Sequence, residues 1–175
     1  MPGMAHLCAG SSAAEVGPIL MLGVGNRFRR DDGFAYHVAA ELWRALGVER
    51  TLDELEELQV HGQLRTLCLP QLVPELAELL AQQEVVVLVD AAVGGPAGLT
   101  LCQVQPASGP GLWWSHSGGL ARLASLAKRL YGQVPRLFVL SVPGEDFSYG
   151  EGLSAGVAGL VKPAVQELLQ LLTGR

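Results

Sequence analysis

The sequence predicts an α/β fold, a three-layer sandwich in which a mostly parallel, doubly wound central sheet is flanked by helices. Short, continuously apolar runs, which suit strands buried on both faces, alternate with stretches whose apolar residues recur every three or four positions. This alternation is typical of parallel strands joined by right-handed crossover helices. The 175 residues suffice for one domain. We expect a single α/β domain at 18–175, preceded by a mobile N-terminal extension at 1–17.

The first half of the chain contains the two strongest strand signals. Ile19–Val24 is apolar throughout and leads into glycines, whereas Val85–Asp90 is dominated by β-branched residues and should lie centrally. Between them, apolar residues every four positions from Phe34 predict a helix that ends near Gly47. The other candidates are a weak edge strand at Glu56–Val60 and a helix at Pro74–Gln82.

The second half continues the alternation. Leu99–Val104 and Arg136–Val142 have the composition of strands, and regularly spaced leucines predict a helix at Gly119–Leu130 between them. Ser154–Leu172 carries the apolar stripe of a closing amphipathic helix, which Lys162-Pro163 should bend. The whole pattern implies a mostly parallel sheet.

Charge and composition exclude several classes of protein. The formal net charge is −5 and the only basic run, Arg27 to Arg30, is short, so we expect no nucleic-acid partner. No apolar run approaches the roughly 18 residues of a membrane span, so we expect no membrane association. The cysteines are widely separated and lack CxxC spacing, which fits a reducing, cytoplasmic location.

Ionisable side chains are predicted at the C-terminal edge of the sheet, where open parallel sheets bind ligands. Asp90 ends the most buried predicted strand, and Asp31-Asp32 follows the loop after the first strand. His116 lies in the loop before a predicted helix, so it too can fold over this edge. The carboxylates of Asp32 and Asp90 with the imidazole of His116 form a ligand set that suits nickel, zinc or manganese and leaves positions open.

These residues also have structural explanations. Asp31 is best explained as a helix N-cap, whereas for Asp32 a cap and a functional role stand equal. Asp90 could cap a turn, but an ionised group at the end of an apolar strand needs a specific partner, which favours function. Most lone histidines are structural, and His116 is set apart only by its loop. The others, His6, His37 and His61, are interpreted as structural or solvated.

The segment Gly23-Val-Gly-Asn26 resembles a dinucleotide-binding loop only superficially. The dinucleotide-binding motif GxGxxG would require glycine where Phe28 stands. The sequence also lacks the phosphate-loop and GxSxG motifs, which counts against a nucleotide-binding protein or a small-molecule hydrolase. The glycines are better explained by close backbone approach at a sharp turn, where Asn26 can bond to the loop internally.

Several short motifs occur in order along the chain. Leu22-Gly-Val-Gly-Asn26 is followed by Asp31-Asp32-Gly33 and then by Val89-Asp90-Ala91. Ser115-His116 comes next, and Gly150-Glu-Gly-Leu-Ser154 precedes the last predicted helix. In this order and spacing the motifs resemble those of the nickel-iron hydrogenase maturation endopeptidases. The resemblance covers most of the chain.

The resemblance implies a protease that removes the C-terminal extension of a nickel-loaded hydrogenase large-subunit precursor. It places Asp32, Asp90 and His116 on the family's metal-contacting and catalytic positions. The metal would be nickel supplied by the substrate, for which another divalent ion substitutes in the isolated protein. We expect a cytoplasmic monomer, because transient engagement of a large subunit requires an accessible crevice.

The sequence departs from the family pattern in two places. Asp32 stands where many members carry glutamate, so the metal would lie closer to the first helix or the loop would shift. Gln59-Val-His-Gly-Gln-Leu64 and the following Leu69-Pro-Gln-Leu-Val-Pro-Glu75 replace a glycine-rich Asp-Gly segment. This second departure resembles the branch that serves soluble bidirectional hydrogenases.

The residue types leave the mechanism open. A carboxylate acting as general base on water and polarisation of the scissile carbonyl by the metal both suit the predicted site. An aspartic-protease dyad fits less well, because it gives the histidine no role. The alternative function is a non-catalytic chaperone or checkpoint that binds the nickel-bearing precursor without cutting it.

Overall fold

The computed structural model describes residues 17–106 and 116–173, with only the backbone described for His116 and Ser117. The predicted extension at 1–17, except for Gly17, lies outside the described residues. Within the described ranges, no helix is long and apolar enough to span a membrane.

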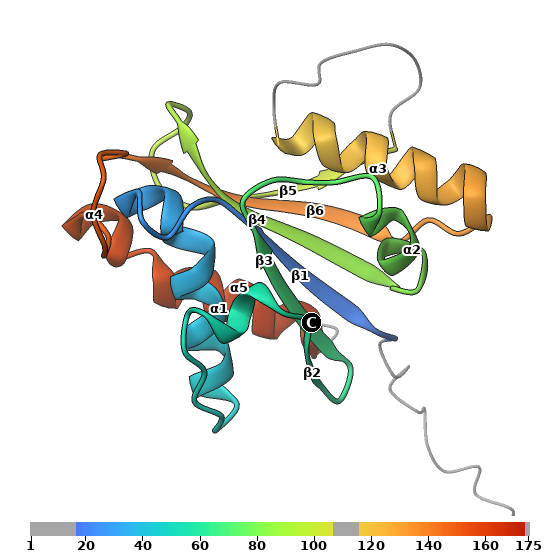
Figure 1. Ribbon diagram of the computed structural model, residues 1–175, viewed down its shortest axis with the longest axis horizontal. Helices are drawn as coiled ribbons and strands as arrows, with labels where there is room; N and C mark the ends of the chain where they lie inside the picture. Colours follow the sequence, from blue (N-terminus) through green and yellow to red (C-terminus); the bar gives the residue numbers. More distant parts are fainter. Residues whose placement is uncertain (1–16, 107–115, 174–175) are drawn as a thin grey trace, which may run out of the picture.

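In the described part of the chain, six strands form one sheet in the order β2-β3-β1-β4-β6-β5 (Figure 1). The strands are β1 (Ile19–Val24), β2 (Gln59–His61), β3 (Leu64–Leu69), β4 (Val85–Val93), β5 (Thr100–Val104) and β6 (Arg136–Gly144). The four inner strands run parallel, and the edge strands β2 and β5 are antiparallel to their neighbours. The mostly parallel sheet is therefore confirmed.

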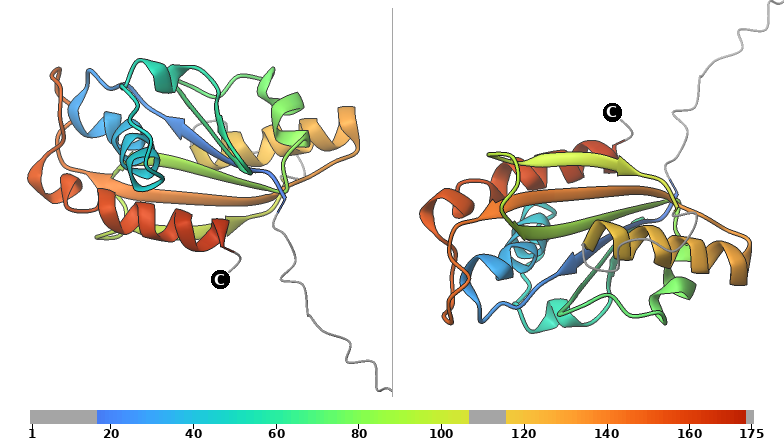
Figure 2. Two further views of the ribbon diagram at one scale, coloured as in Figure 1. Left: turned by 90° about the horizontal axis from the view of Figure 1, so that it is seen from below. Right: turned by 90° about the horizontal axis from the view of Figure 1, so that it is seen from above.

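Helices cover both faces of this sheet (Figure 2). Two helices pack together on one face, α1 (Phe34–Ala45) and α5 (Val161–Leu172), and two on the other, α2 (Leu76–Ala81) and α3 (His116–Tyr131). The connections contain the short helices η1 (Arg30–Gly33), η2 (Glu54–Glu56) and α4 (Ala155–Ala158). The result is the predicted three-layer sandwich.

The burial of β1 explains its uninterrupted apolar sequence. Ile19 and Met21 pack into the core beneath α1 and α5, whereas Leu20 and Leu22 pack into the core beneath α2 and α3. Because side chains alternate between the faces of a strand, a strand covered on both faces must be apolar at every position. The same reasoning holds for the central strand β4, whose first five residues are all buried.

The order in which successive strands are added to the sheet reverses at β1. After β1 it passes through α1 to β3 on one side, and after β3 it passes through α2 to β4 on the other side of β1. The C-terminal ends of β1 and β4 therefore flank a topological switch point, the place where open α/β sheets form ligand crevices. This topology decides where the candidate site lies.

The predictions for the region between α1 and α2 are partly wrong. The edge strand begins at Gln59 rather than Glu56, because Glu54–Glu56 form η2. The strand β3, which the sequence pattern does not single out, follows directly and pairs with β2 as an antiparallel hairpin. Four of its six residues are buried, but the partly exposed Arg65 interrupts the apolar run that would have marked it in the sequence.

The closing helix is broken earlier than predicted. Instead of bending at Lys162-Pro163, the chain leaves α4 at Gly159 and starts α5 at Val161. Pro163 lies in the first turn of α5, before Ala164 N–H donates to Leu160 O at 3.0 Å. Because the first amides of a helix have no intrahelical acceptor, proline is tolerated there without a kink.

Candidate active site

The loop after β1 is closed by hydrogen bonds that lead to Asp32. Gly25 N–H donates to Leu69 O at 3.1 Å, which fixes the start of the loop against β3. Asn26 N–H donates to Asp32 Oδ2 at 2.9 Å, and Asn26 Oδ1 accepts from Phe28 N–H at 2.9 Å. The predicted internal bonding of Asn26 is confirmed, and its effect is to hold the half-buried Asp32 carboxylate in place.

Two glycines allow this loop to lie against its neighbours. A Cβ atom on Gly23 would lie 2.6 Å from Cys68 Sγ and 2.9 Å from Ala35 Cβ, so α1 could not approach β1 as closely. Gly25 has φ +143°, and a Cβ atom there would collide with the backbone carbonyl oxygen of Asp32. The prediction that these glycines serve close backbone approach is therefore confirmed.

Asp31 is a buried anchor, and the prediction that it caps a helix is wrong. Its fully buried carboxylate accepts the N–H groups of Glu145, Asp146 and Ser154 at 2.7 to 2.9 Å and the Ser154 hydroxyl at 2.8 Å. Burial by itself raises the pKa of Asp31, but hydrogen bonds from Ser154, Asp146 and Glu145 outweigh it and lower that pKa. These partners lie far along the chain, so a local capping pattern cannot reveal them.

Asp90 lies inside β4 rather than at its end, because the strand continues to Val93. Its side chain is 6% exposed and, by alternation with Leu88, belongs to the face covered by α2 and α3. Pairing between β1 and β4 stops at Val89, whereas β4 still pairs with β6, where Asp90 lies opposite Ser141. Asp90 therefore stands where β1 leaves the sheet.

The structure places the two elements that carry the predicted acidic residues next to each other. The helical turn η1, which carries Asp32, lies against β4, which carries Asp90. The predicted loop position of His116 is wrong, because helix α3 begins at this residue on the same face as Asp90; the His116 side chain lies outside the described residues. Among the described residues, no three histidine, cysteine, aspartate or glutamate side chains are grouped to hold a metal ion. The three-ligand set remains a prediction.

A second loop, between β6 and α4, is joined to the loop that carries Asp32. Arg30 N–H donates to Gly150 O and Gly150 N–H to Phe28 O, both at 2.9 Å. The Arg30 backbone has φ +44°, a conformation that costs free energy in a residue other than glycine. The sequence marks this second loop by the motif Gly150-Glu-Gly-Leu-Ser154, but its hydrogen bonding to the first loop was not predicted.

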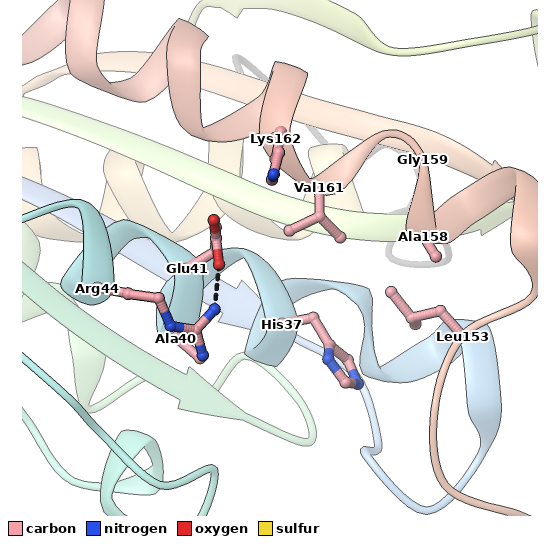
Figure 3. Close-up of a pocket in the computed structure, with 9 residues that line it drawn as sticks. All are labelled: His37, Ala40, Glu41, Arg44, Leu153, Ala158, Gly159, Val161 and Lys162. Atoms are coloured by element: carbon pink, nitrogen blue, oxygen red, sulfur yellow. Dashed lines mark hydrogen bonds and ion pairs between the residues drawn. The ribbon is translucent and has the colours of Figure 1, made fainter.

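A separate pocket of about 420 Å³ lies on the other side of the sheet, between α1 and the α4–α5 segment (Figure 3). It is lined by His37, Ala40, Glu41, Arg44, Leu153, Ala158, Gly159, Val161 and Lys162. Burial lowers the pKa of His37. Because Asp90 faces α2 and α3, this pocket does not contain the predicted acidic pair.

Comparison with known proteins supports the fold. No protein-family model and no curated protein matches the sequence. The hydrogenase maturating endopeptidase HybD from Escherichia coli is 23% identical with a TM-score of 0.65, over 89% of this chain and 91% of that chain. The nickel-iron hydrogenase maturation protease HycI from Thermococcus kodakarensis is 20% identical with a TM-score of 0.60, over 91% and 94%.

A hydrogenase 2 maturation peptidase from a Thaumarchaeota archaeon is 22% identical with a TM-score of 0.55, over 89% of this chain and 97% of that chain. The structural similarity to these three proteins thus extends over 89% to 91% of this chain. The protein therefore has the fold of hydrogenase maturation proteases, the family that its motifs resemble.

Proposed function

We propose that the protein is an endopeptidase that removes the C-terminal extension of a nickel-iron hydrogenase large-subunit precursor after nickel insertion. The observation that carries this proposal is the juxtaposition of η1, with Asp32, and β4, with Asp90, at the switch point of this fold. Adjacent loops of a parallel sheet converge there on whatever enters the crevice. The extended C-terminus of another protein is a suitable occupant, because it can pass over an open edge.

The nickel is part of the substrate in this proposal. Asp32, Asp90 and His116 contact it and thereby report that the precursor is loaded. Carboxylate and imidazole donors suit a borderline divalent ion such as nickel, and three donors leave positions for ligands that the precursor retains. Asp32 is held for this role by Asn26 N–H and Asp90 by the central strand. In the isolated protein another divalent ion would take the place of nickel.

Cleavage is hydrolysis of one peptide bond. The oxygen of water bonds to the scissile carbonyl carbon, the carbon–nitrogen bond breaks, and a proton from the water passes to the departing amine. Asp32 or Asp90 is able to carry that proton as a general base and then a general acid. Polarisation of the carbonyl by the nickel of the precursor is the second route consistent with these residues.

The proposal includes a cytoplasmic location and a monomeric state for the protein. We place it in the cytoplasm, since Cys68 and Cys102 are both free thiols. A monomer would leave the crevice open to a partner as large as a hydrogenase subunit. Sedimentation velocity of the purified protein measures this directly, and a stable dimer would require a revised account of access.

The test is mass spectrometry of a nickel-loaded large-subunit precursor after incubation with the protein, beside nickel-free precursor. We expect loss of a C-terminal peptide only from the loaded form. Asp32→Asn, Asp90→Asn and His116→Gln should abolish this loss while circular dichroism shows a folded protein. Glu49→Gln is the matched carboxylate control, because Glu49 is largely exposed and paired only with Arg44 in the described structure.

Three other outcomes of this experiment would contradict parts of the proposal. An uncut but nickel-dependent complex would favour a checkpoint protein over an enzyme. Cleavage of both the nickel-loaded and the nickel-free precursor would show that the protein does not need nickel to recognise its substrate. Full processing by folded Asp90→Asn would refute the assignment of that residue.

A further inference from the structure

Three exposed apolar side chains lie at the edge of the sheet that carries the candidate site. Val93 is 88% exposed, Tyr149 86% and Phe28 47%. Val93 is the last residue of β4, Phe28 follows β1 and Tyr149 follows β6, so all three lie at the C-terminal edge of the parallel strands. Figure 1 shows the ends of these strands and the loops that follow them at one end of the molecule. We call these three residues the rim patch.

The rim patch is connected to the loop that carries Asp32. Asn26 receives a hydrogen bond from Phe28 N–H and gives one to the Asp32 carboxylate, so Phe28 is linked to Asp32 through a single residue. Val93 follows Asp90 by three residues on the same strand. By the alternation that places Asp90 on the face covered by α2 and α3, Val93 points to the opposite face of β4, so it marks the sheet edge beside the site, whereas Phe28 belongs to the loop that holds Asp32.

Backbone hydrogen bonds and arginine side chains hold the two aromatic residues of the patch in place. Gly150 N–H donates to Phe28 O at 2.9 Å, which joins the loop of Phe28 to the loop of Tyr149. The Arg29 guanidinium lies over the Tyr149 ring, with 5.9 Å to its centroid, and the Arg27 guanidinium lies over Phe28 at 4.3 Å. Such stacking and backbone bonding reduce the conformational entropy that is lost on binding a partner.

This composition favours a protein as the partner. Exposed aromatic residues beside arginine are enriched at the energetically important centres of protein interfaces, and clustered exposed apolar side chains mark interaction surfaces. A small substrate would need an enclosed pocket, whereas the residues of the rim patch are exposed at the end of β4 and on the loops that follow β1 and β6. The folded body of a protein whose tail enters the crevice would rest on these loops.

We propose that the rim patch is the docking surface for the folded body of the precursor, at the point where its C-terminal extension enters the site. This inference rests on the proposed function and adds the residues that select the partner. The rim patch contributes affinity for the precursor, and the acidic site contributes cleavage.

The experiment compares wild-type protein with Phe28→Ala/Tyr149→Ala, using the whole nickel-loaded precursor and measuring cleavage rates over a range of precursor concentrations. We expect KM to rise roughly tenfold or more with kcat unchanged, as for the loss of interface hot spots. Tyr131→Ala is the matched control. Tyr131 is 46% exposed, close to the 47% of Phe28, but it ends α3 just before the N-terminal end of β6, and its loss should leave KM unchanged.

The outcomes separate this inference from the proposed function. If wild-type protein does not cleave the precursor, the proposed function fails. If wild-type protein cleaves it and the double variant has the same KM, or the Tyr131→Ala control shows the same rise, the docking surface is overturned. Loss of self-association in the double variant with unchanged KM would overturn it too, in favour of a contact between two copies. Equal thermal midpoints of wild type and variants exclude misfolding.

Discussion

Gly25 lies directly against the backbone carbonyl of Asp32, with no room between them for a Cβ atom. The two residues are the start and the end of the loop that follows β1, and the Asn26–Asp32 hydrogen bond closes it. A glycine with φ +143° thus sets the position of a proposed site residue seven positions later.

Gly25→Ala should abolish processing, because the new methyl group displaces Asp32 and the backbone conformation is strained. We expect an unfolding free energy lower by about 1–3 kcal/mol, measured by urea denaturation. Gly47→Ala is the control, since Gly47 has φ +79° but open space around it. It should cost about 1–2 kcal/mol and leave processing intact. Normal processing by Gly25→Ala would contradict the proposed role of this loop.

Gly23→Ala should destabilise the protein by about 1–3 kcal/mol, because its methyl group overlaps Cys68 Sγ and Ala35 Cβ. Adding Cys68→Ala removes one of these overlaps. A double-mutant cycle should therefore show favourable coupling of about 1 kcal/mol between the two substitutions. Strictly additive losses would mean that contact with Ala35 alone accounts for the requirement for glycine.

Thr66→Val tests a buried polar contact that supports α1. Trp43 Nε1 donates to Thr66 Oγ1 at 2.8 Å, and both residues are fully buried. Valine would leave the indole N–H without this acceptor, which should lower the unfolding free energy by about 1–3 kcal/mol. Thr66→Ser keeps the hydroxyl and should cost only about 1 kcal/mol for the lost methyl group. A valine variant as stable as wild type would contradict this account.

His37 should make stability depend on pH. Burial lowers its pKa below the ordinary value of 6.5, so on acidification the unfolded state binds the proton first. The free energy of unfolding should fall as the pH falls from about 6.5 through the pKa of the folded state. The charged groups lining the same pocket are Glu41, Arg44 and Lys162. Urea denaturation at several pH values should show a shallower dependence for His37→Gln, and an unchanged one would exclude His37 as the source.

Most of the sheet follows from patterns within short segments. The predicted bounds of β1 are those observed, and the β-branched run from Val85 marks the central strand. These predictions succeed because burial on both faces leaves a continuous apolar signal. The strand β3 escapes detection because Arg65 interrupts its apolar residues, and its identity depends on pairing with β1 and β2.

Local pattern was also enough to choose Asp32 and Asp90 as candidates, since both follow or lie in strongly apolar strands at one edge of the sheet. It could not distinguish the roles of the neighbours Asp31 and Asp32. Asp31 is a buried anchor whose partners include Ser154, 123 residues away, whereas Asp32 bonds within its own loop. Adjacent residues on a helical turn point in different directions, and only the packing of a distant loop decides which carboxylate becomes enclosed.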